Sequence, residues 1–319
     1  MSNLEAAPAE VACNASGIVD TVPAIQVLQP RDVPLGGPRA LRVQRTLPHR
    51  QRSLIGAWCF IDHYGPTTAN MDVPPHPHTG LQTVSWLLGG EVEHRDSAGV
   101  HAMIRPGELN LMTAGAGICH SEVSVEAPSP LHGVQLWVAL PDADRDTARD
   151  FVHYAPEPVR FPGGIARVFL GQLAGGRSPV HTFSPLLGAQ IDIDARAQLE
   201  LGIEPAFEHG VLCDVGRVRL GDTALAAAEL GYQGPGRATL RLGNVGERPA
   251  RVLLLGGTPF GEQLVMWWNF VGRSHDDIVR YRRLWEDTDD RFGAVAGYAG
   301  SVRRLSAPPL PAIRLRPRP

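Results

Sequence analysis

HPHTGLQTV (residues 76–84) and TAGAGICHSE (residues 113–122) begin and end the most informative stretch of this chain. The first segment contains His76 and His78 and the second contains His120 and Glu122, so each holds two metal-ligand residue types at positions i and i+2. Alternate side chains of a β-strand project from one face, whereas i and i+2 lie on different sides of a helix. If the two segments are neighbouring strands, three imidazoles and one carboxylate converge on one point inside a barrel.

The residues between the two pairs have the pattern of strands and turns. Residues 83–88 (TVSWLL) are β-branched, aromatic and apolar, and Gly89-Gly90 ends the run. Residues 96–99 (DSAG) are typical of a hairpin turn, and residues 106–107 (PG) mark another. A single pair of this kind arises by chance more often than by function. Two pairs at strand spacing, separated by strands, predict a metal site with four ligands: His76, His78, His120 and Glu122.

The composition favours a turn-rich β-protein, because the 319 residues include 35 Gly and 28 Pro and show few long helical patterns. The net charge of −3 gives no basic footprint for nucleic acid. No apolar run approaches the roughly 18 residues of a membrane-spanning helix, and the first residues lack a secretory pattern. The four cysteines lack CxxC spacing. We therefore expect a cytoplasmic protein that binds neither nucleic acid nor a membrane.

The sequence predicts two domains with flanking segments. They are a loose leader or strap (1–36), a metal-binding domain (37–143), an irregular connector (144–163), a second domain (164–297) and a Pro- and Arg-rich tail (298–319).

The second domain shows signs of repeating the first, since residues 212–218 resemble residues 87–92. In that alignment the places of the four predicted ligands fall on or near Gly202, Glu204, Pro249 and Arg251. None of these is a histidine, so we expect the second domain to keep the scaffold without the ligands. We interpret His209 as structural.

Three local patterns add further predictions. Residues 57–61 read as a buried strand that ends in a turn at residues 62–66 (DHYGP), where His63 is more often a hydrogen-bonded turn residue than a ligand of the same cavity. Residues 191–203 alternate like one half-solvated strand. Ser274 and Asp277 predict a helix N-terminus followed by an apolar stripe.

Three motifs resemble the pirin family of the cupin superfamily: HPHTGLQTVSWLLGGEVEHRDSAG (76–99), IRPGELNLMTAGAGICHSE (104–122) and, more weakly, MWWNFVGRSHDDI (266–278). The resemblance spans residues 40–297. It implies an all-β bicupin fold: two antiparallel β-barrel (jelly-roll) domains face to face, with a short C-terminal helix. It also implies one metal in the N-terminal barrel, on the same four ligands. One departure is Gln82, where the broader cupin pattern has glutamate, and we expect this change to affect hydrogen bonding around the metal.

Three imidazoles and one carboxylate suit a borderline divalent ion such as Fe(II), and they leave coordination positions open. We expect Fe(II), with Mn, Co, Ni, Cu and Zn as alternatives. The resemblance implies a bacterial quercetinase-like pirin, similar to enzymes that open the heterocycle of quercetin with O2 and release carbon monoxide. Glu122 would then be a ligand, a catalytic general base, or both. The partners implied are a small aromatic substrate and O2. The alternative is a non-catalytic, iron-binding, redox-sensitive regulator of a protein partner. A sugar-isomerase reading is weaker, because the chain shows no phosphate-binding loop.

Overall fold

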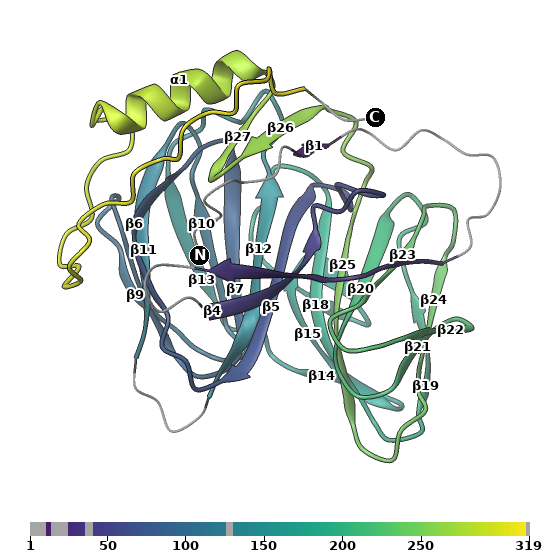
Figure 1. Ribbon diagram of the computed structural model, residues 1–319. Helices are drawn as coiled ribbons and strands as arrows, with labels where there is room; N and C mark the ends of the chain where they lie inside the picture. The colour runs from purple at the N-terminus through teal and green to yellow at the C-terminus, as the bar shows by residue number, and fades with distance from the viewer. Residues whose placement is uncertain (1–10, 14–24, 36–40, 126–129, 317–319) are drawn as a thin grey trace.

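The computed structural model describes residues 11–13, 25–35, 41–125 and 130–316, and it confirms the predicted all-β fold. Two antiparallel β-barrels lie side by side, and the one helix found in these ranges lies over one end of the first barrel (Figure 1). Each barrel combines a seven-stranded sheet with a four-stranded sheet.

The first barrel carries the predicted ligands. Its large sheet has the order β13-β10-β7-β12-β5-β4-β3, made of β3 (Arg31–Leu35), β4 (Leu41–Leu47), β5 (Trp58–Thr67), β7 (Leu81–Gly89), β10 (Leu109–Thr113), β12 (Leu131–Ala139) and β13 (Asp150–Tyr154). Its small sheet has the order β6-β11-β8-β9, made of β6 (Asp72–His78), β8 (Val92–Asp96), β9 (His101–Ile104) and β11 (Ile118–Ser124). The two ligand segments are therefore neighbouring strands, as predicted.

The second barrel repeats this topology. Its large sheet has the order β14-β15-β18-β25-β20-β23-β2, made of β2 (Gln26–Leu28), β14 (Val159–Phe161), β15 (Gly164–Leu170), β18 (Leu186–Ile193), β20 (Glu208–Val215), β23 (Leu230–Gln233) and β25 (Ala250–Gly257). Its small sheet has the order β19-β24-β21-β22, made of β19 (Gln198–Gly202), β21 (Val218–Leu220), β22 (Thr223–Leu225) and β24 (Thr239–Asn244). The short hairpin of β16 (Gln172–Leu173) and β17 (Gly176–Arg177) stands apart.

The topology corrects the alignment of the two halves. Strand β24 occupies the place of β11, so the positions that correspond to His120 and Glu122 fall on β24 and not near Pro249 and Arg251. Leu240 and Leu242 of β24 are buried in the apolar core of the second barrel. Apolar side chains thus fill this barrel where the first one holds ligands.

Residues 26–35 connect the two barrels. Strand β2 pairs with β23 of the second barrel, and β3 pairs with β4 of the first. This part of the predicted leader therefore acts as a strap, while residues 1–10, 14–24 and 36 lie outside the described residues.

The turn predicted at residues 62–66 is wrong, because β5 continues through it to Thr67. Gly65 has a φ of +83°, and a side chain there would meet the carbonyl oxygen of Leu131 on the paired strand. The Gly-Pro pair marks a β-bulge opposite β12, where the register shifts, rather than a chain reversal.

Two other segments also differ from expectation. Residues 144–163 are not simply irregular, because they supply β13 and β14, which are outermost strands of the two large sheets. Such strands are partly exposed, which explains their polar composition. Residues 191–203 form parts of two strands, β18 and β19, separated by a turn in which Arg196 has a φ of +58°. The domain boundaries themselves stay a prediction.

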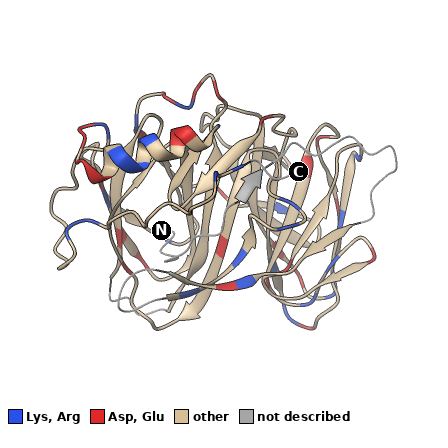
Figure 2. Cartoon of the chain, turned by 45° about the horizontal axis from the view of Figure 1, so that its top comes forward, with Lys and Arg blue, Asp and Glu red and all other residues tan. Residues whose placement is uncertain are grey.

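The helix α1 (His275–Glu286) begins as predicted, with Ser274 and Asp277 forming a capping box and Ile278, Tyr281 and Trp285 buried. It packs on a small sheet of β1 (Val11–Cys13), β26 (Leu264–Trp267) and β27 (Phe270–Gly272). Among the described residues, no helix has the length and apolarity required to cross a membrane. Figure 2 shows acidic and basic residues interspersed over both barrels and along α1.

Candidate metal centre

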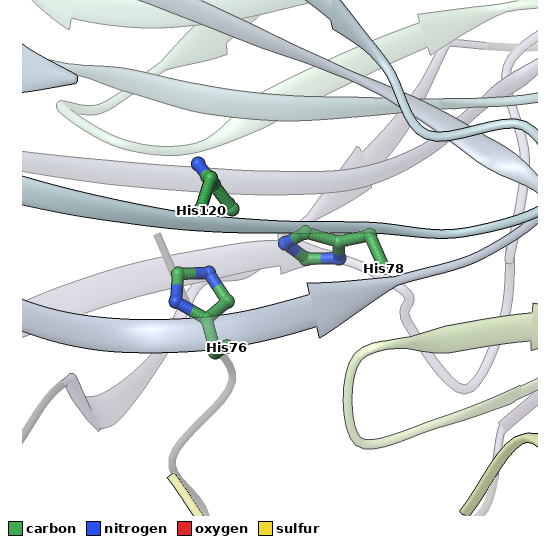
Figure 3. A group of neighbouring side chains, drawn as sticks. All are labelled: His76, His78 and His120. Carbon is green, nitrogen blue, oxygen red and sulfur yellow. The ribbon is translucent and has the colours of Figure 1, made fainter. Parts of the chain in front are cut away.

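Three of the four predicted ligands meet inside the first barrel. His76 lies directly opposite His120 in the pairing of β6 with β11. His78 lies two residues further along β6, on the same face of the strand. The ring centroids of His76 and His120 are 4.2 Å apart, and each lies 5.0 Å from the ring of His78. All three side chains are fully buried, and Figure 3 shows them gathered between the two strands.

Hydrogen bonds orient the rings of His76 and His78 as metal ligands. The Nδ1 of His76 is 2.8 Å from the carbonyl oxygen of Pro74, and the Nδ1 of His78 is 3.1 Å from that of Asn269. A carbonyl only accepts, so each Nδ1 carries the proton and each Nε2 presents a lone pair. The Nε2 atoms of His76, His78 and His120 are buried and have no hydrogen-bond partner among the described residues. Three converging, unsatisfied lone pairs are the arrangement that a divalent metal ion satisfies.

Burial also keeps these rings neutral. Burial, and then the charge of its histidine neighbours, lowers the pKa of His76 well below 6.5, and the same causes act on His120. Burial likewise lowers the pKa of His78. Because a metal binds the neutral imidazole, the protein holds the three rings in the form that coordination requires.

Glu122 belongs to a neighbouring group of donors. Its carboxylate lies with His94 and His120, and the donor atoms of these three residues are within 4.8 Å of one another. His120 and Glu122 keep the predicted alternation on β11, which pairs regularly with β8, whereas the register with β6 shifts by one residue between His76 and Val73. His76, His78 and His120 form a second group, which shares His120 with the first, and the four predicted ligands do not form one group. The set of four ligands therefore stays a prediction.

Sequence reasoning missed His94. It lies opposite Glu122 across the pair of β11 and β8, and its Nδ1 is 3.5 Å from the Nδ1 of His120. Its Nε2 is 3.2 Å from a carboxylate oxygen of Asp96. The signal was present in the sequence, because His94 and Asp96 repeat the i, i+2 spacing on a strand.

A polar pair on the facing sheet adjoins Glu122. The hydroxyl of Ser85 lies 3.2 Å from Oε1 of Glu122 and 2.9 Å from the side-chain amide of Gln135. Both partners are oxygens, so the single hydroxyl proton of Ser85 is donated either to the amide oxygen of Gln135 or to the carboxylate of Glu122. When it is donated to Glu122, this hydrogen bond orients the carboxylate.

An aromatic stack lies beside the other end of the ligand group. The rings of Phe60 and Trp137 stack at 4.1 Å, and Trp137 meets the ring of His78 edge-on at 5.1 Å. Both aromatic side chains are buried, and the guanidinium of Arg45, which is ion-paired with buried Asp62, lies 4.2 Å from the centre of the Phe60 ring.

Gln82 does not contact the ligand group. It is three residues from Ser85 on β7, and an odd separation places the two side chains on opposite faces of the sheet. Its amide donates to Thr113, and it lines a small cavity with His181 and Phe183 of the second half. The expectation that Gln82 alters hydrogen bonding around the metal is therefore wrong.

His63 also points away from the centre. Its Nε2 lies 2.8 Å from Oδ1 of Asp214 on the second barrel, so it is a hydrogen-bonded residue of the contact between barrels.

Comparison with known proteins agrees with this architecture. The family model described as Pirin matches residues 40–138, and the model of the Pirin C-terminal cupin domain matches residues 188–293. A Pseudomonas aeruginosa protein provisionally named quercetin 2,3-dioxygenase is 45% identical over 292 residues, which cover 90% of this chain and 91% of that protein. The chain belongs to the pirin family.

Solved structures resemble this pirin over most of its length. A crystal structure named quercetin 2,3-dioxygenase from Acinetobacter baumannii has a TM-score of 0.85 and 36% identity, covering 92% of this pirin and 98% of that chain. A bacterial pirin from Escherichia coli in complex with nickel(II) has a TM-score of 0.59 and 17% identity, covering 74% of this pirin and all of that chain. The second likeness shows the fold alone.

Proposed function

We propose that this pirin is a metal-dependent dioxygenase that opens the heterocycle of a flavonol, such as quercetin, with O2 and releases one carbon as carbon monoxide. The observation that supports this most is the meeting of three buried, neutral imidazoles whose Nε2 atoms have no partner among the described residues. The names of two relatives, a Pseudomonas protein and an Acinetobacter structure, supply the substrate class.

We infer that His76, His78 and His120 hold the ion, with Glu122 as fourth ligand, and that the ion is Fe(II). Imidazole suits Fe, Ni, Cu and Zn alike, so the donor set supports a divalent transition metal, and the choice of iron rests on the O2 chemistry. When bound, the ion supplies Lewis-acid polarisation of the flavonol oxygen and a template for the reacting groups.

The protein groups around the ligands have distinct tasks in this proposal. The carboxylate of Glu122 accepts the proton of the flavonol 3-hydroxyl, and the hydrogen bond from Ser85 keeps that carboxylate aimed at one position. The buried stack of Phe60 and Trp137 excludes water beside His78, which strengthens electrostatic interactions with the flavonolate.

The experiment is an oxygen-electrode assay of the full chain, stripped of metal and reloaded with Fe(II), with quercetin as substrate. We expect consumption of one O2 per quercetin and release of carbon monoxide, with the flavonol absorbance lost only in the presence of O2. His78→Ala should abolish turnover, and His101→Gln is the control, since His101 is exposed and pairs with Glu93.

Two outcomes would contradict the proposal. Equal loss of flavonol absorbance with and without O2 would exclude a dioxygenase. A chain that binds iron tightly yet consumes no O2 with any flavonol would favour the regulator.

A further inference from the structure

A second cluster of metal-ligand side chains lies between the barrels. His63 on β5 and His132 on β12 belong to the first barrel, and Asp214 on β20 belongs to the second. The Nε2 atoms of the two histidines lie 2.8 Å and 2.6 Å from the same oxygen, Oδ1 of Asp214. The donor atoms of all three residues are within 4.8 Å of one another.

This spacing is close to that of a metal site. Two donors on one ion, with bonds of about 2.1 Å, lie about 3.0 Å apart at right angles and about 3.4 Å apart in a tetrahedron. The two observed distances need to lengthen by about 0.2–0.8 Å to admit an ion. All three residues lie on strands of packed sheets, so the donors are held in place without an ion.

The surroundings suit a cation that enters from solvent. The side chain of Asp214 is fully buried, that of His63 is 5% exposed, and that of His132 is 15% exposed and offers a path of entry. Arg251 lies 3.4 Å from the other oxygen of Asp214, Oδ2, which leaves Oδ1 to the histidines. Arg251 is itself paired with Asp192, so its charge is partly balanced.

We propose that His63, His132 and Asp214 form a second, weaker site for a divalent transition-metal ion such as Zn²⁺ or Ni²⁺, bridging the two barrels. Two imidazoles and one carboxylate are a donor set for these borderline ions, and the three residues leave room for solvent ligands.

The site is weaker than the first centre for a structural reason. Coordination through Nε2 moves the imidazole proton to Nδ1, and the Nδ1 of His63 is buried without a partner among the described residues. The corresponding atoms of His76 and His78 have backbone carbonyl partners. Because such outer partners are typically worth about 10–100-fold in metal affinity, we expect the inter-barrel ion to bind about 10–100-fold more weakly than an ion in the first centre.

The test is a calorimetric titration of the chelator-stripped full chain with Zn²⁺ and, separately, with Ni²⁺. We expect two equivalents of different affinity. His132→Gln and Asp214→Asn should each lose the weaker equivalent and keep the tighter one, whereas His78→Ala should do the reverse. His101→Gln, an exposed histidine hydrogen-bonded to Glu93, is the matched control and should keep both. Anomalous diffraction from a Zn²⁺-soaked crystal should place a peak between the three side chains.

The number of metal equivalents bound by each variant shows whether the inter-barrel site exists. If His132→Gln and Asp214→Asn bind metal as the unmodified chain does, the inference is overturned. If the chain binds one equivalent and His132→Gln removes it, the inter-barrel site stands and the first centre fails. If His132→Gln keeps that equivalent, the inter-barrel site fails. His132 is partly exposed, so its variant carries the test should Asp214→Asn not fold.

Discussion

The hydroxyl of Ser85 lies between the carboxylate of Glu122 and the side-chain amide of Gln135. Without it, the carboxylate loses an orienting partner and the amide of Gln135 loses a hydrogen bond, while no backbone contact changes. A residue of this kind acts on a metal centre through the ligand that it orients.

We predict that Ser85→Ala lowers the metal affinity of the first centre by about 10–100-fold. Isothermal titration of the chelator-stripped protein with Ni²⁺ or Fe(II) measures this directly. The control is Ser184→Ala, because the buried hydroxyl of Ser184 has no hydrogen-bond partner among the described residues. Equal affinities for the two variants would show that Ser85 does not position Glu122.

The sequence was sufficient to predict that the three histidines meet. It was insufficient to predict how Glu122 and Gln82 lie around them. Strand periodicity alone places His76, His78 and His120 together, because it needs only two neighbouring strands. The position of Glu122 relative to His76 and His78 depends on a bulge in β6 opposite β11, and a pattern of alternation contains no information about such a shift. Gln82 was misjudged for a related reason. It follows His78 by four residues, but the chain leaves β6 at His78 and enters β7 at Leu81, so alternation does not carry over from one strand to the other.

Strand β20 contains His209, a buried histidine that should make the stability of the fold depend on pH. His209 is 1% exposed and adjoins the ring of Phe207. Burial lowers the pKa of His209 to about 4. In the unfolded chain its pKa is about 6.5, so between these values the unfolded state binds the extra proton and stability falls as the pH falls.

We predict that His209→Gln removes this acid sensitivity. On going from pH 7 to pH 5, the free energy of unfolding of the unmodified chain should fall by about 2 kcal/mol more than that of the variant. Guanidinium unfolding of both chains at the two pH values, with chelator present, measures the difference. A parallel decline in the two chains would mean that His209 titrates normally in the folded barrel.

The helix α1 depends on its cap. The hydroxyl of Ser274 accepts a hydrogen bond from the N–H of Asp277, and the carboxylate of Asp277 accepts one from the N–H of Ser274. We predict that Ser274→Ala lowers the free energy of unfolding by about 1 kcal/mol, while Ser274→Thr, which keeps the hydroxyl, loses less. Thermal unfolding of the two variants provides the comparison, and equal losses would show that the cap is not the cause.

Helices and strands were predictable from the sequence where local residue patterns alone determine where the element begins or ends. The start of α1 is such a case, because cap, charge and apolar stripe agree at one point. The bulge at Gly65 was read as a turn, since glycine and proline mark both features and only the paired strand distinguishes them. Strands β13 and β14 were missed because they are partly exposed and short, so their sequence resembles that of a loop.

At the scale of the whole molecule, the two barrels share one apolar core. Trp58 and Trp86 of the first barrel pack in the same buried cluster as Phe169, Leu212 and Leu253 of the second. The ring of Trp86 lies 4.6 Å from that of Phe169, and its indole N–H donates to Gln190 at 3.0 Å. A continuous interface of this kind should make the barrels unfold together rather than separately.

We predict that Trp86→Phe destabilises both barrels, because it leaves the side-chain amide oxygen of Gln190 buried without this donor, at a cost of about 1–3 kcal/mol. Native-state hydrogen exchange should then show amides of β20 and β25, far from the substituted strand in sequence, exchanging about 5- to 150-fold faster. Trp285→Phe is the matched control: its indole donates to the carbonyl of Leu305, so faster exchange should stay near α1 and the tail. Loss of protection confined to the first barrel in Trp86→Phe would show that the barrels are independent units. The strap of β2 and β3 would then be their main connection, and an ion between His63, His132 and Asp214 would be the contact best placed to couple them.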